Sequence, residues 1–158
     1  QLIQQSSVQE LATIIHEYGE EPYTQAKHLA EVIVANRPYN DTETLAALIK
    51  QHYRGRIGKI HPATRTFQAL RIAVNDELGQ IRETLPLLPT LLRAGGRVGV
   101  ISFHSLEDRL VKRFFKEQVE NGLEAELHPL TKKPISGATD DVHNPRSRSA
   151  KLRVAVKK

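Results

Sequence analysis

Apolar positions in the first part of the chain recur at the spacing of short helices. Residues 7–10, Ser-Val-Gln-Glu, form a capping box that predicts a helix ending near residues 18–19, with Gly19 as the residue that closes it. Pro22 predicts the first turn of a second helix, which runs to about Ala35 because an Arg-Pro pair follows. The first part of the chain is therefore predicted to be helical and compact.

A third helix and a basic loop come next. Residues 40–43, Asn-Asp-Thr-Glu, provide the cap of this helix, and apolar side chains recur along its inner face. Glycines bracket a basic loop, 54–59, which we expect to be flexible and to offer a contact for phosphate. The inner face of the third helix is formed by Leu45, Leu48 and Ile49.

The longest uninterrupted helical pattern begins at Pro62 and runs to about Leu78. One stripe along it is apolar and is predicted to be buried, and a polar stripe runs beside it. The polar stripe either faces a cleft or packs through hydrogen bonds at a domain boundary, and both interpretations stay open. The apolar stripe is Phe67, Leu70, Val74 and Leu78, and the polar stripe is Thr64, Gln68, Arg71 and Asn75.

A strand followed by a helix is predicted in the middle of the second half. Residues 80–93 form an apolar helix, broken or restarted at a proline, and the glycine pair 95–96 separates it from a buried strand at 98–101. Ser105 then caps an amphipathic helix, with Asp108 as its capping-box partner. Ligands of α/β proteins bind at such junctions, so the polar residues there are candidates for function. They are His104, Ser105, Asp108 and Arg109.

The C-terminal part predicts a small sheet. We expect a weak strand at 126–131, a loop at 134–145, and a last strand at 150–156, where small or apolar residues alternate with polar ones. The predicted fold class is therefore α/β, with a helical subdomain followed by a partial sheet. An incomplete sheet leaves an open edge, and a homodimer that covers this edge is a further expectation.

The composition is that of a folded protein. Hydrophobic residues make up 39% and charged residues 26% of 158 positions, a balance that disfavours intrinsic disorder. No apolar run approaches the length of a membrane span, and no signal peptide is visible. The absence of cysteine excludes disulfides and thiolate metal sites and fits a cytoplasmic location. The chain begins at Gln1 and contains no methionine, so we expect it to be a piece of a longer protein.

Positive charge accumulates toward the C-terminus. The net charge is +5, and from Pro129 onward eight Lys or Arg residues oppose two Asp. This imbalance predicts a polyanionic partner, with nucleic acid ahead of an acidic membrane; lysines that only aid solubility are the alternative. The helix after the junction also carries a basic stripe, for which a solvated face is the commoner explanation. That stripe is Arg109, Lys112, Arg113 and Lys116.

Residues 144–149 are a more specific signal for phosphate. Arg146 and Arg148 are two positions apart, surrounded by serines and without an acidic residue among them. Their planar guanidinium groups can each hold a phosphate through two hydrogen bonds. We therefore favour a phosphate or nucleic-acid contact over a passive loop.

Other chemistries are disfavoured by the motifs. Ser105 lacks the G-x-S-x-G turn of a hydrolase nucleophile, and capping a helix explains it better. The histidines show no H-E-x-x-H or other metal-ligand spacing, so no metal site is expected. The glycines form no G-x-G-x-x-G, and hence no dinucleotide-binding loop.

Three long segments together resemble one known family. They are residues 61–78, HPATRTFQALRIAVNDEL; residues 95–109, GGRVGVISFHSLEDR, with their continuation to Phe114-Phe115; and residues 144–153, NPRSRSAKLR. Their order and spacing are similar to those of the bacterial small-subunit ribosomal RNA (cytosine-N4)-methyltransferases, the RsmH or MraW family. The resemblance spans nearly the whole chain.

This resemblance implies an S-adenosylmethionine-dependent enzyme that methylates the exocyclic N4 amine of a cytidine in small-subunit ribosomal RNA. Residues 1–60 would be its helical insert, with helices continuing to about 78. Residues 61–158 would be the C-terminal part of its Rossmann-like methyltransferase domain. The family's Gly-rich cofactor loop, its ribose-binding acid and its aspartate-containing strand end lie upstream of Gln1. No cofactor ligand or catalytic residue is therefore assigned, and we expect the chain alone to be inactive.

By this resemblance the chain supplies the RNA side of the active site, with the small ribosomal subunit as partner. A non-enzymatic RNA- or ribosome-binding module is the alternative, and a purely helical protein-interaction domain is disfavoured by the arginine-serine segment. The residues expected to line the cytidine pocket from the long helix are His61, Thr64, Arg65, Gln68, Arg71 and Asn75. Those expected to close it from the sheet are His104, Ser105, Asp108 and Arg109, and those expected to hold flanking phosphates are Asn144, Arg146 and Arg148.

Overall fold

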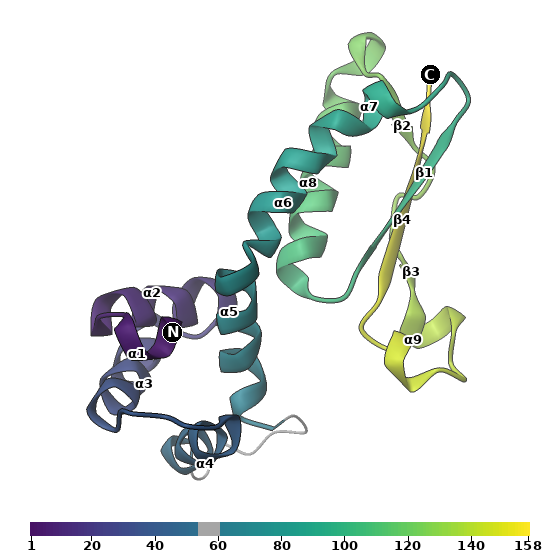
Figure 1. Cartoon of the computed structure of the whole chain (residues 1–158). Helices are drawn as coiled ribbons and strands as arrows, with labels where there is room; N and C mark the ends of the chain where they lie inside the picture. Colours follow the sequence, from purple (N-terminus) through teal and green to yellow (C-terminus); the bar gives the residue numbers. More distant parts are fainter. Residues whose placement is uncertain (54–60) are drawn as a thin grey trace. The chain divides into compact units, whose positions relative to one another are not determined.

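The computed structural model describes residues 1–53 and 61–158. The chain divides into two compact units, Gln1–Glu77 and Leu78–Lys158 (Figure 1). The helix that follows Pro62 packs with the helices before it and belongs to the first unit. The basic loop 54–59 lies outside the described residues.

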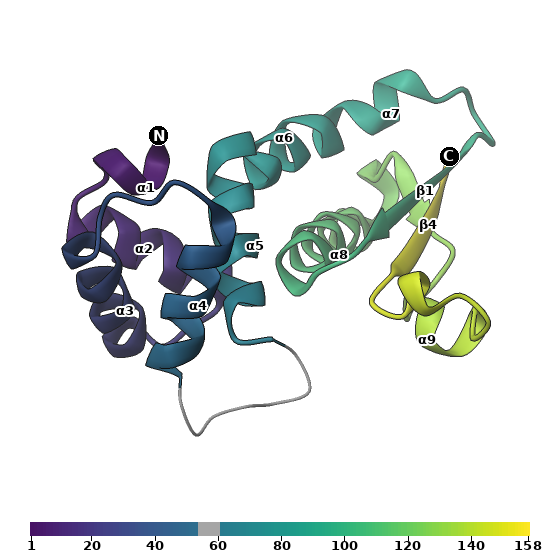
Figure 2. The same cartoon turned by 60° about the horizontal axis from the view of Figure 1, so that its bottom comes forward.

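The first unit is helical. A short N-terminal turn is followed by helices that bury one face each, and α2 packs against both α3 and α5 while α3 packs against α4 (Figure 2). The core is apolar and includes the fully buried side chains of Leu11, Ile15, Leu29, Ile33 and Ile49. The elements are α1 (Leu2–Gln5), α2 (Val8–Gly19), α3 (Tyr23–Ala35), α4 (Thr42–His52) and α5 (Ala63–Asn75).

The predicted helix starts of this unit are confirmed. Ser7 Oγ accepts from the Glu10 backbone N–H at 3.2 Å, and Glu10 Oε2 accepts from the Ser7 backbone N–H at 2.7 Å, which completes the capping box. Asp41 Oδ1 accepts from the Thr44 N–H at 2.7 Å and caps α4. These bonds satisfy backbone donors that would otherwise be open at each helix start.

The role predicted for Gly19 is wrong. Gly19 is the last helical residue of α2, and Glu20 takes the left-handed conformation that closes the helix, at φ 52°. A Cβ at Gly19 would lie 3.4 Å from the backbone oxygen of Arg65. This is an ordinary van der Waals distance, so Gly19 packs against α5 and does not reverse the chain.

The long helical pattern also ends earlier than predicted. Helix α5 stops at Asn75, because Asp76 is left-handed at φ 48°, and α8 in the second unit is the longer helix. Val74, predicted to be buried, is 66% exposed. The rest of the predicted stripe is confirmed, since Leu70 and Leu78 are buried and Phe67 packs, partly buried, against the core. The buried residues of α5 are Ala63, Thr66, Ala69, Leu70 and Ile72.

The second unit is a small sheet with helices. The predicted interruption at the prolines is confirmed, since a 3₁₀ turn with Pro86 separates two short helices. The predicted loop 134–145 instead contains a short strand and a single helical turn. The elements are α6 (Glu77–Thr84), η1 (Leu85–Leu87), α7 (Leu88–Leu91), β1 (Arg97–Ser102), α8 (Ser105–Glu120), η2 (Gly122–Glu124), β2 (Leu127–Pro129), β3 (Ile135–Ser136), α9 (Gly137–Asp140), η3 (Pro145–Ser147) and β4 (Lys151–Lys157).

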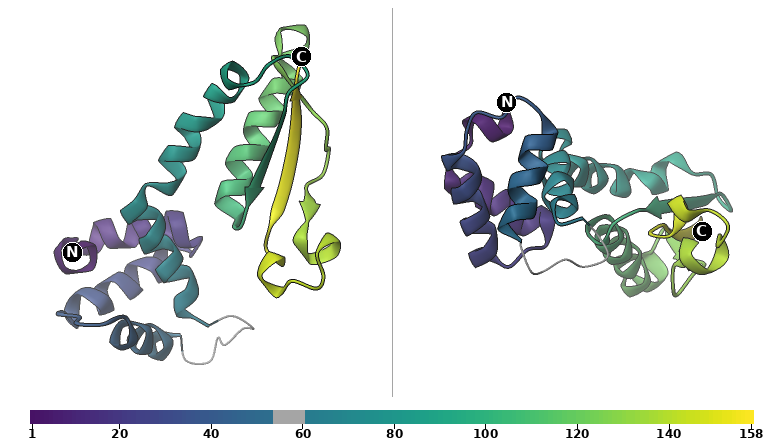
Figure 3. Two further views of the ribbon diagram at one scale, coloured as in Figure 1. Left: turned by 45° about the vertical axis from the view of Figure 1, so that its right-hand side comes forward. Right: turned by 90° about the horizontal axis from the view of Figure 1, so that it is seen from below.

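The described sheet is antiparallel and is built around β4. Its order is β1-β4-β2, with β3 also paired to β4, and the register runs from Arg97 opposite Val156 to Ser102 opposite Lys151. Helix α8 lies along the sheet (Figure 3). The core between them contains Leu85, Val111, Phe115, Leu127 and Ala155.

The α/β class and the last strand are confirmed, but the prediction that β1 is buried is wrong. Its side chains alternate, and Ile101, which points away from α8, is 59% exposed. No helix within residues 1–53 or 61–158 combines the length and the hydropathy that a bilayer-spanning segment requires.

Candidate functional site

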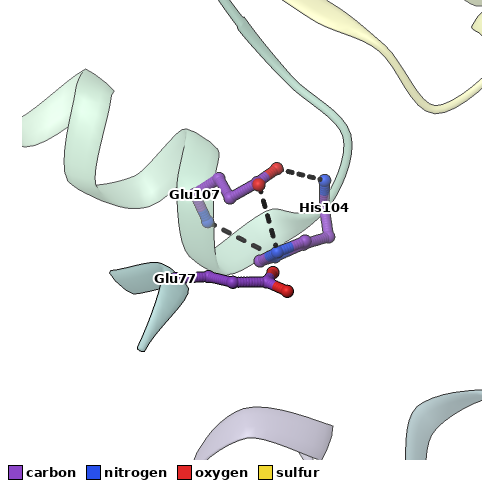
Figure 4. A group of neighbouring side chains, drawn as sticks. All are labelled: Glu77, His104 and Glu107. Atoms are coloured by element: carbon purple, nitrogen blue, oxygen red, sulfur yellow. Dashed lines mark hydrogen bonds and ion pairs between the residues drawn. The ribbon is translucent and has the colours of Figure 1, made fainter. Parts of the chain in front are cut away.

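A histidine caps the helix that follows β1. His104 Nδ1 accepts from the Glu107 N–H at 3.4 Å, and Glu107 Oε2 accepts from the N–H groups of His104 at 3.2 Å and Phe103 at 2.7 Å (Figure 4). The imidazole Nε2 also lies 3.4 Å from Glu107 Oε1. The prediction that Ser105 is the cap and Asp108 its partner is therefore wrong by one residue, since Ser105 is already helical.

Asp108 instead forms a buried ion pair with β4. Its Oδ1 accepts from Arg153 Nε at 2.8 Å, and its Oδ2 accepts from Arg153 Nη2 and Lys151 Nζ, both at 3.2 Å. Asp108 and Arg153 are each only 7% exposed. Burial alone would raise the pKa of the Asp108 carboxyl, but the hydrogen bonds and positive charge of Arg153 and Lys151 together outweigh it and lower that pKa. The carboxylate thus fixes two cations on the first residues of β4.

The arginine-serine segment lies at the same end of the sheet as the start of α8. Ser102, at the end of β1, pairs with Lys151, at the start of β4; α8 begins shortly after the one and η3 ends shortly before the other. Within the described ranges, the guanidinium groups of Arg146 and Arg148 have no ion pair or hydrogen bond, and both side chains are exposed. This end of the sheet therefore gathers positive groups: Arg109, Arg146, Arg148 and Lys151.

The backbone around Arg146 and Arg148 is held by several hydrogen bonds. The Ser147 hydroxyl lies 2.8 Å from the carbonyl oxygen of Asn144 and 3.0 Å from that of Asp141, and either oxygen can accept its proton. The Gly137 N–H donates to the carbonyl oxygen of Ala150 at 2.9 Å. A Cβ at Gly137 would fall 1.9 Å from Ser147 O, so only glycine permits this contact. Asn144 Oδ1 accepts from the Arg146 N–H at 3.1 Å, which gives Asn144 a capping role. The exposed guanidinium groups are therefore carried on a well-braced turn.

The predicted pocket residues of the helical unit are mostly engaged within that unit. Arg71 donates to both carboxylate oxygens of Glu77, at 2.7 and 3.0 Å, and Asn75 Nδ2 donates to Glu77 Oε1 at 3.2 Å. Arg65 lies 3.4 Å from Glu21, and His61 Nδ1 accepts from the Ala63 N–H at 3.2 Å. Thr64 is exposed and Gln68 partly so. The structure thus brings Arg71 and Asn75 together around an acid that the sequence did not single out.

Two residues that bind the Asp108 carboxylate were not singled out from the sequence. Lys151 and Arg153 counted only as part of the basic C-terminal segment. No local signal marked them, because the apolar residues of the last strand, Leu152, Val154 and Val156, alternate with Arg153 and Ala155, whose face is the buried one. Asp108, one turn into the facing helix, is the acid that binds Arg153.

The chain as a whole matches a family of methylases. The model of the MraW methylase family matches residues 1–158. The chain belongs to the MraW methylase family. The predicted resemblance is thereby confirmed, and the α/β unit is part of the Rossmann-like fold of these methyltransferases.

Several curated proteins that are similar to this chain share one name. Proteins named "Ribosomal RNA small subunit methyltransferase H" are similar to it from Deinococcus radiodurans (54% identity, 92% of this chain and 45% of the relative), Synechocystis sp. (50% identity, 99% and 50%) and Acidobacterium capsulatum (47% identity, 100% and 52%). The chain thus spans about half the length of the curated relatives it matches.

The described residues do not fit S-adenosylmethionine. The turn from β1 into α8 carries Phe103 and His104 where a nucleotide-type cofactor would need glycine for close approach of the backbone. The Glu107 N–H in the first turn of α8 is engaged by His104, and the N–H groups of Phe103 and His104 just before the helix are engaged by Glu107. Across residues 1–53 and 61–158 no Gly-rich turn links a strand to a helix.

Proposed function

We propose that this chain takes part in methylating the N4 amine of a cytidine in small-subunit ribosomal RNA, with S-adenosylmethionine as the methyl donor and the cytoplasm as its place of action. The observation that carries the proposal is the family match over residues 1–158, supported by 47–54% identity to three proteins named for small-subunit ribosomal RNA methylation. The exposed, braced arginines of the sheet unit are consistent with an RNA substrate.

The chemistry explains why RNA positioning matters. The lone pair of the cytosine N4 amine is delocalised into the ring, so the amine is a weak nucleophile. Enzymes that act on a base take it out of its stack and align it with the reacting partner, and alignment alone can supply several kcal/mol of the barrier. In this proposal the chain contributes that alignment.

The residues of the sheet unit divide into two roles. Arg146 and Arg148 bind RNA phosphates, because their exposed planar groups can each donate two hydrogen bonds to one phosphate. Asp108 is a positioning residue, since its carboxylate is committed to Arg153 and Lys151. Lys151, whose side chain is 42% exposed, is thereby held as a further cation beside the start of α8.

In the helical unit, the polar stripe of α5 is the proposed lining of the cytidine pocket. Thr64 and Gln68 keep polar groups accessible to a base. Arg71 and Asn75 are oriented by Glu77, which restricts their rotamers and so lowers the entropy lost on binding. His61 and Arg65 stand at the beginning of the same helix.

Disruption of the gene that encodes this chain tests the function in the cell. Nucleosides from purified small-subunit ribosomal RNA are analysed by mass spectrometry with and without the gene. We expect loss of N4-methylated cytidine on disruption and its return on complementation. An unchanged amount of that nucleoside would refute the proposal.

Two measurements test whether the chain alone binds the methyl donor and transfers its methyl group. Calorimetric titration with S-adenosylmethionine should show no micromolar binding, and incubation with small ribosomal subunits and labelled donor should give no methyl transfer. Binding or transfer by the chain alone would contradict the substrate-side assignment.

The phosphate role predicts a change in salt dependence. Replacing Arg146 and Arg148 by alanine removes two phosphate contacts, so the slope of log K against log salt for single-stranded RNA should fall by about 1.4. A matched variant with Lys27→Ala and Lys50→Ala carries the same change of charge on the exposed surface of the helical unit. Equal slopes for the two variants would refute the phosphate assignment.

A further inference from the structure

A groove lies between α8 and the β2 edge of the sheet, away from the arginine-serine segment. Its volume is about 570 Å³, within the range of sites that hold a small molecule or a single nucleotide. Strand β2 pairs with the last residues of β4, Pro129 opposite Ala155 and Leu127 opposite Lys157, whereas the arginine-serine segment precedes Lys151 at the other end of that strand. The groove is therefore a separate feature of the sheet unit.

The inner surface of the groove is apolar and accessible. Phe115 and Pro129 contribute its deeper part. Val119 is 61% exposed and Leu130 is 48% exposed. Neither side chain is buried in the core of the unit, so two large apolar groups from different elements line the same open groove without being covered.

The rim of the groove is basic. Lys112, Lys132 and His128 line it, and within residues 1–53 and 61–158 their side chains have no hydrogen bond or ion pair. Lys116 is also present but is paired with Glu120 at 3.0 Å, and the buried Arg153 is neutralised by Asp108. No described acidic residue lines the groove. An apolar inner surface with a basic rim suits an occupant that has a flat or apolar part and a negative charge.

We propose that this groove binds an unpaired nucleotide of the RNA, as a second contact beyond the methylation site. The base lies on Val119, Leu130 and the imidazole of His128, since bases stack on aromatic and apolar side chains when they leave a helix. The adjacent phosphates are neutralised by Lys112 and Lys132. The identification of the occupant as ribosomal RNA rests on the proposed function, whereas the preference for a single strand rests on the groove itself.

Binding of short labelled RNAs to the chain tests the groove. The probes are a single-stranded oligouridylate and an oligo(A)·oligo(U) duplex, followed by fluorescence anisotropy. The double variant Val119→Ser/Leu130→Ser should bind the single strand about tenfold more weakly, with little change for the duplex, because only unstacked bases enter the groove. Both positions are exposed, so the substitutions should leave the fold intact.

Matched controls separate the groove from general effects. Val74→Ser makes the same chemical change at a residue that is 66% exposed on the helical unit, and should leave single-strand binding unchanged. Lys112→Glu/Lys132→Glu should weaken binding more than Lys27→Glu/Lys50→Glu, which alters the net charge equally.

The outcomes decide the proposal independently of the methylation experiment. Equal single-strand binding by Val119→Ser/Leu130→Ser and Val74→Ser overturns the groove proposal. Equal competition against the oligouridylate by an oligoglutamate peptide of the same charge also overturns it, because binding would then depend on charge alone. If the groove variant loses the single strand while gene disruption leaves N4-methylcytidine unchanged, the groove stands and the proposed function fails.

Discussion

In the helical unit the ion pairs lie at the surface, whereas the sheet unit holds one in its interior. Arg65 and Arg71 pair with Glu21 and Glu77; the arginine side chains are 63% and 58% exposed, and the glutamate side chains are 12% and 19% exposed. Arg153 and Asp108 pair with side chains that are 8% and 10% exposed. The helical core is correspondingly apolar, while the sheet unit packs α8 onto β4 partly through charge.

This difference indicates that the two units depend on different forces. Apolar packing tolerates small adjustments of position, because it has no preferred angle. A buried arginine–carboxylate pair with two hydrogen bonds fixes distance and orientation, and its rupture leaves an uncompensated charge. The sheet unit therefore has a sharply defined geometry at the end of the sheet where the positive groups gather.

The largest effect is expected from Arg153→Ala. The change leaves Asp108 buried with Lys151 as its remaining partner, and should lower the stability of the sheet unit by about 4 kcal/mol. Native-state hydrogen exchange at the amides of β1 and β4 measures this loss within that unit. The double variant Asp108→Leu/Arg153→Met removes both charges and should recover most of the stability.

The matched change in the helical unit is Arg65→Ala. Its partner Glu21 is 3.4 Å away and Arg65 is mostly exposed, so the stability of that unit should change by less than about 1 kcal/mol. Similar losses for Arg65→Ala and Arg153→Ala would contradict the contrast between surface and interior pairs.

A somewhat smaller effect is expected from the apolar core of the helical unit. Ile33 is fully buried, and Ile33→Ala should lower the free energy of unfolding by about 3 kcal/mol through the cavity that it leaves. Val74→Ala, on the same unit, should change it by no more than about 0.5 kcal/mol because Val74 is exposed. Urea unfolding followed by circular dichroism measures both, and a costly Val74→Ala would show that this side chain is covered in solution.

Local signals along the sequence were sufficient for the helix starts of the first unit. The capping box at Ser7 and Glu10 and the cap at Asp41 involve residues three positions apart, so the sequence shows both partners at once. Around α8 two polar residues competed for the same role. His104 and Ser105 both offer an acceptor, and spacing alone does not decide which one is already helical.

Contacts between distant residues were not predictable in this way. Asp108 and Arg153 are separated by 45 positions, and their pairing depends on the register of β4 beside β1 and on the rotation of α8. The same holds for the burial of α5, where Ala69 lies beside Gly19 of α2 and is fully buried, whereas the apolar Val74 is exposed. Such facts arise from packing, and a periodic pattern gives only the existence of a buried face.

The smallest expected effect is the loss of stability in acid. It should differ between the two units because their carboxylates lie in different environments. Hydrogen bonds to backbone N–H groups and neighbouring side chains lower the pKa of Glu10 and Asp41 at the helix starts of the first unit, and the balance of burial, hydrogen bonds and charge lowers that of Asp108 in the second. A lowered pKa means that folding favours the ionised form. The associated stability is complete above the usual pKa, 3.8 for an aspartate, and is lost as the pH falls through the lower value of the folded state.

Both units should therefore lose stability below about pH 4, and the sheet unit should lose more, because protonating Asp108 breaks a buried pair rather than an exposed cap. Unit-resolved unfolding by NMR between neutral and acid pH measures the two losses. Asp108→Asn should reduce the fall of stability in acid for the sheet unit and leave it unchanged for the helical unit. Asp41→Asn should reduce this fall for the helical unit only, and by a smaller amount, because asparagine also caps helices. If the sheet unit of Asp108→Asn still lost stability in acid to the same extent, another carboxylate would cause the pH dependence. The contrast between the units would then not depend on the buried pair.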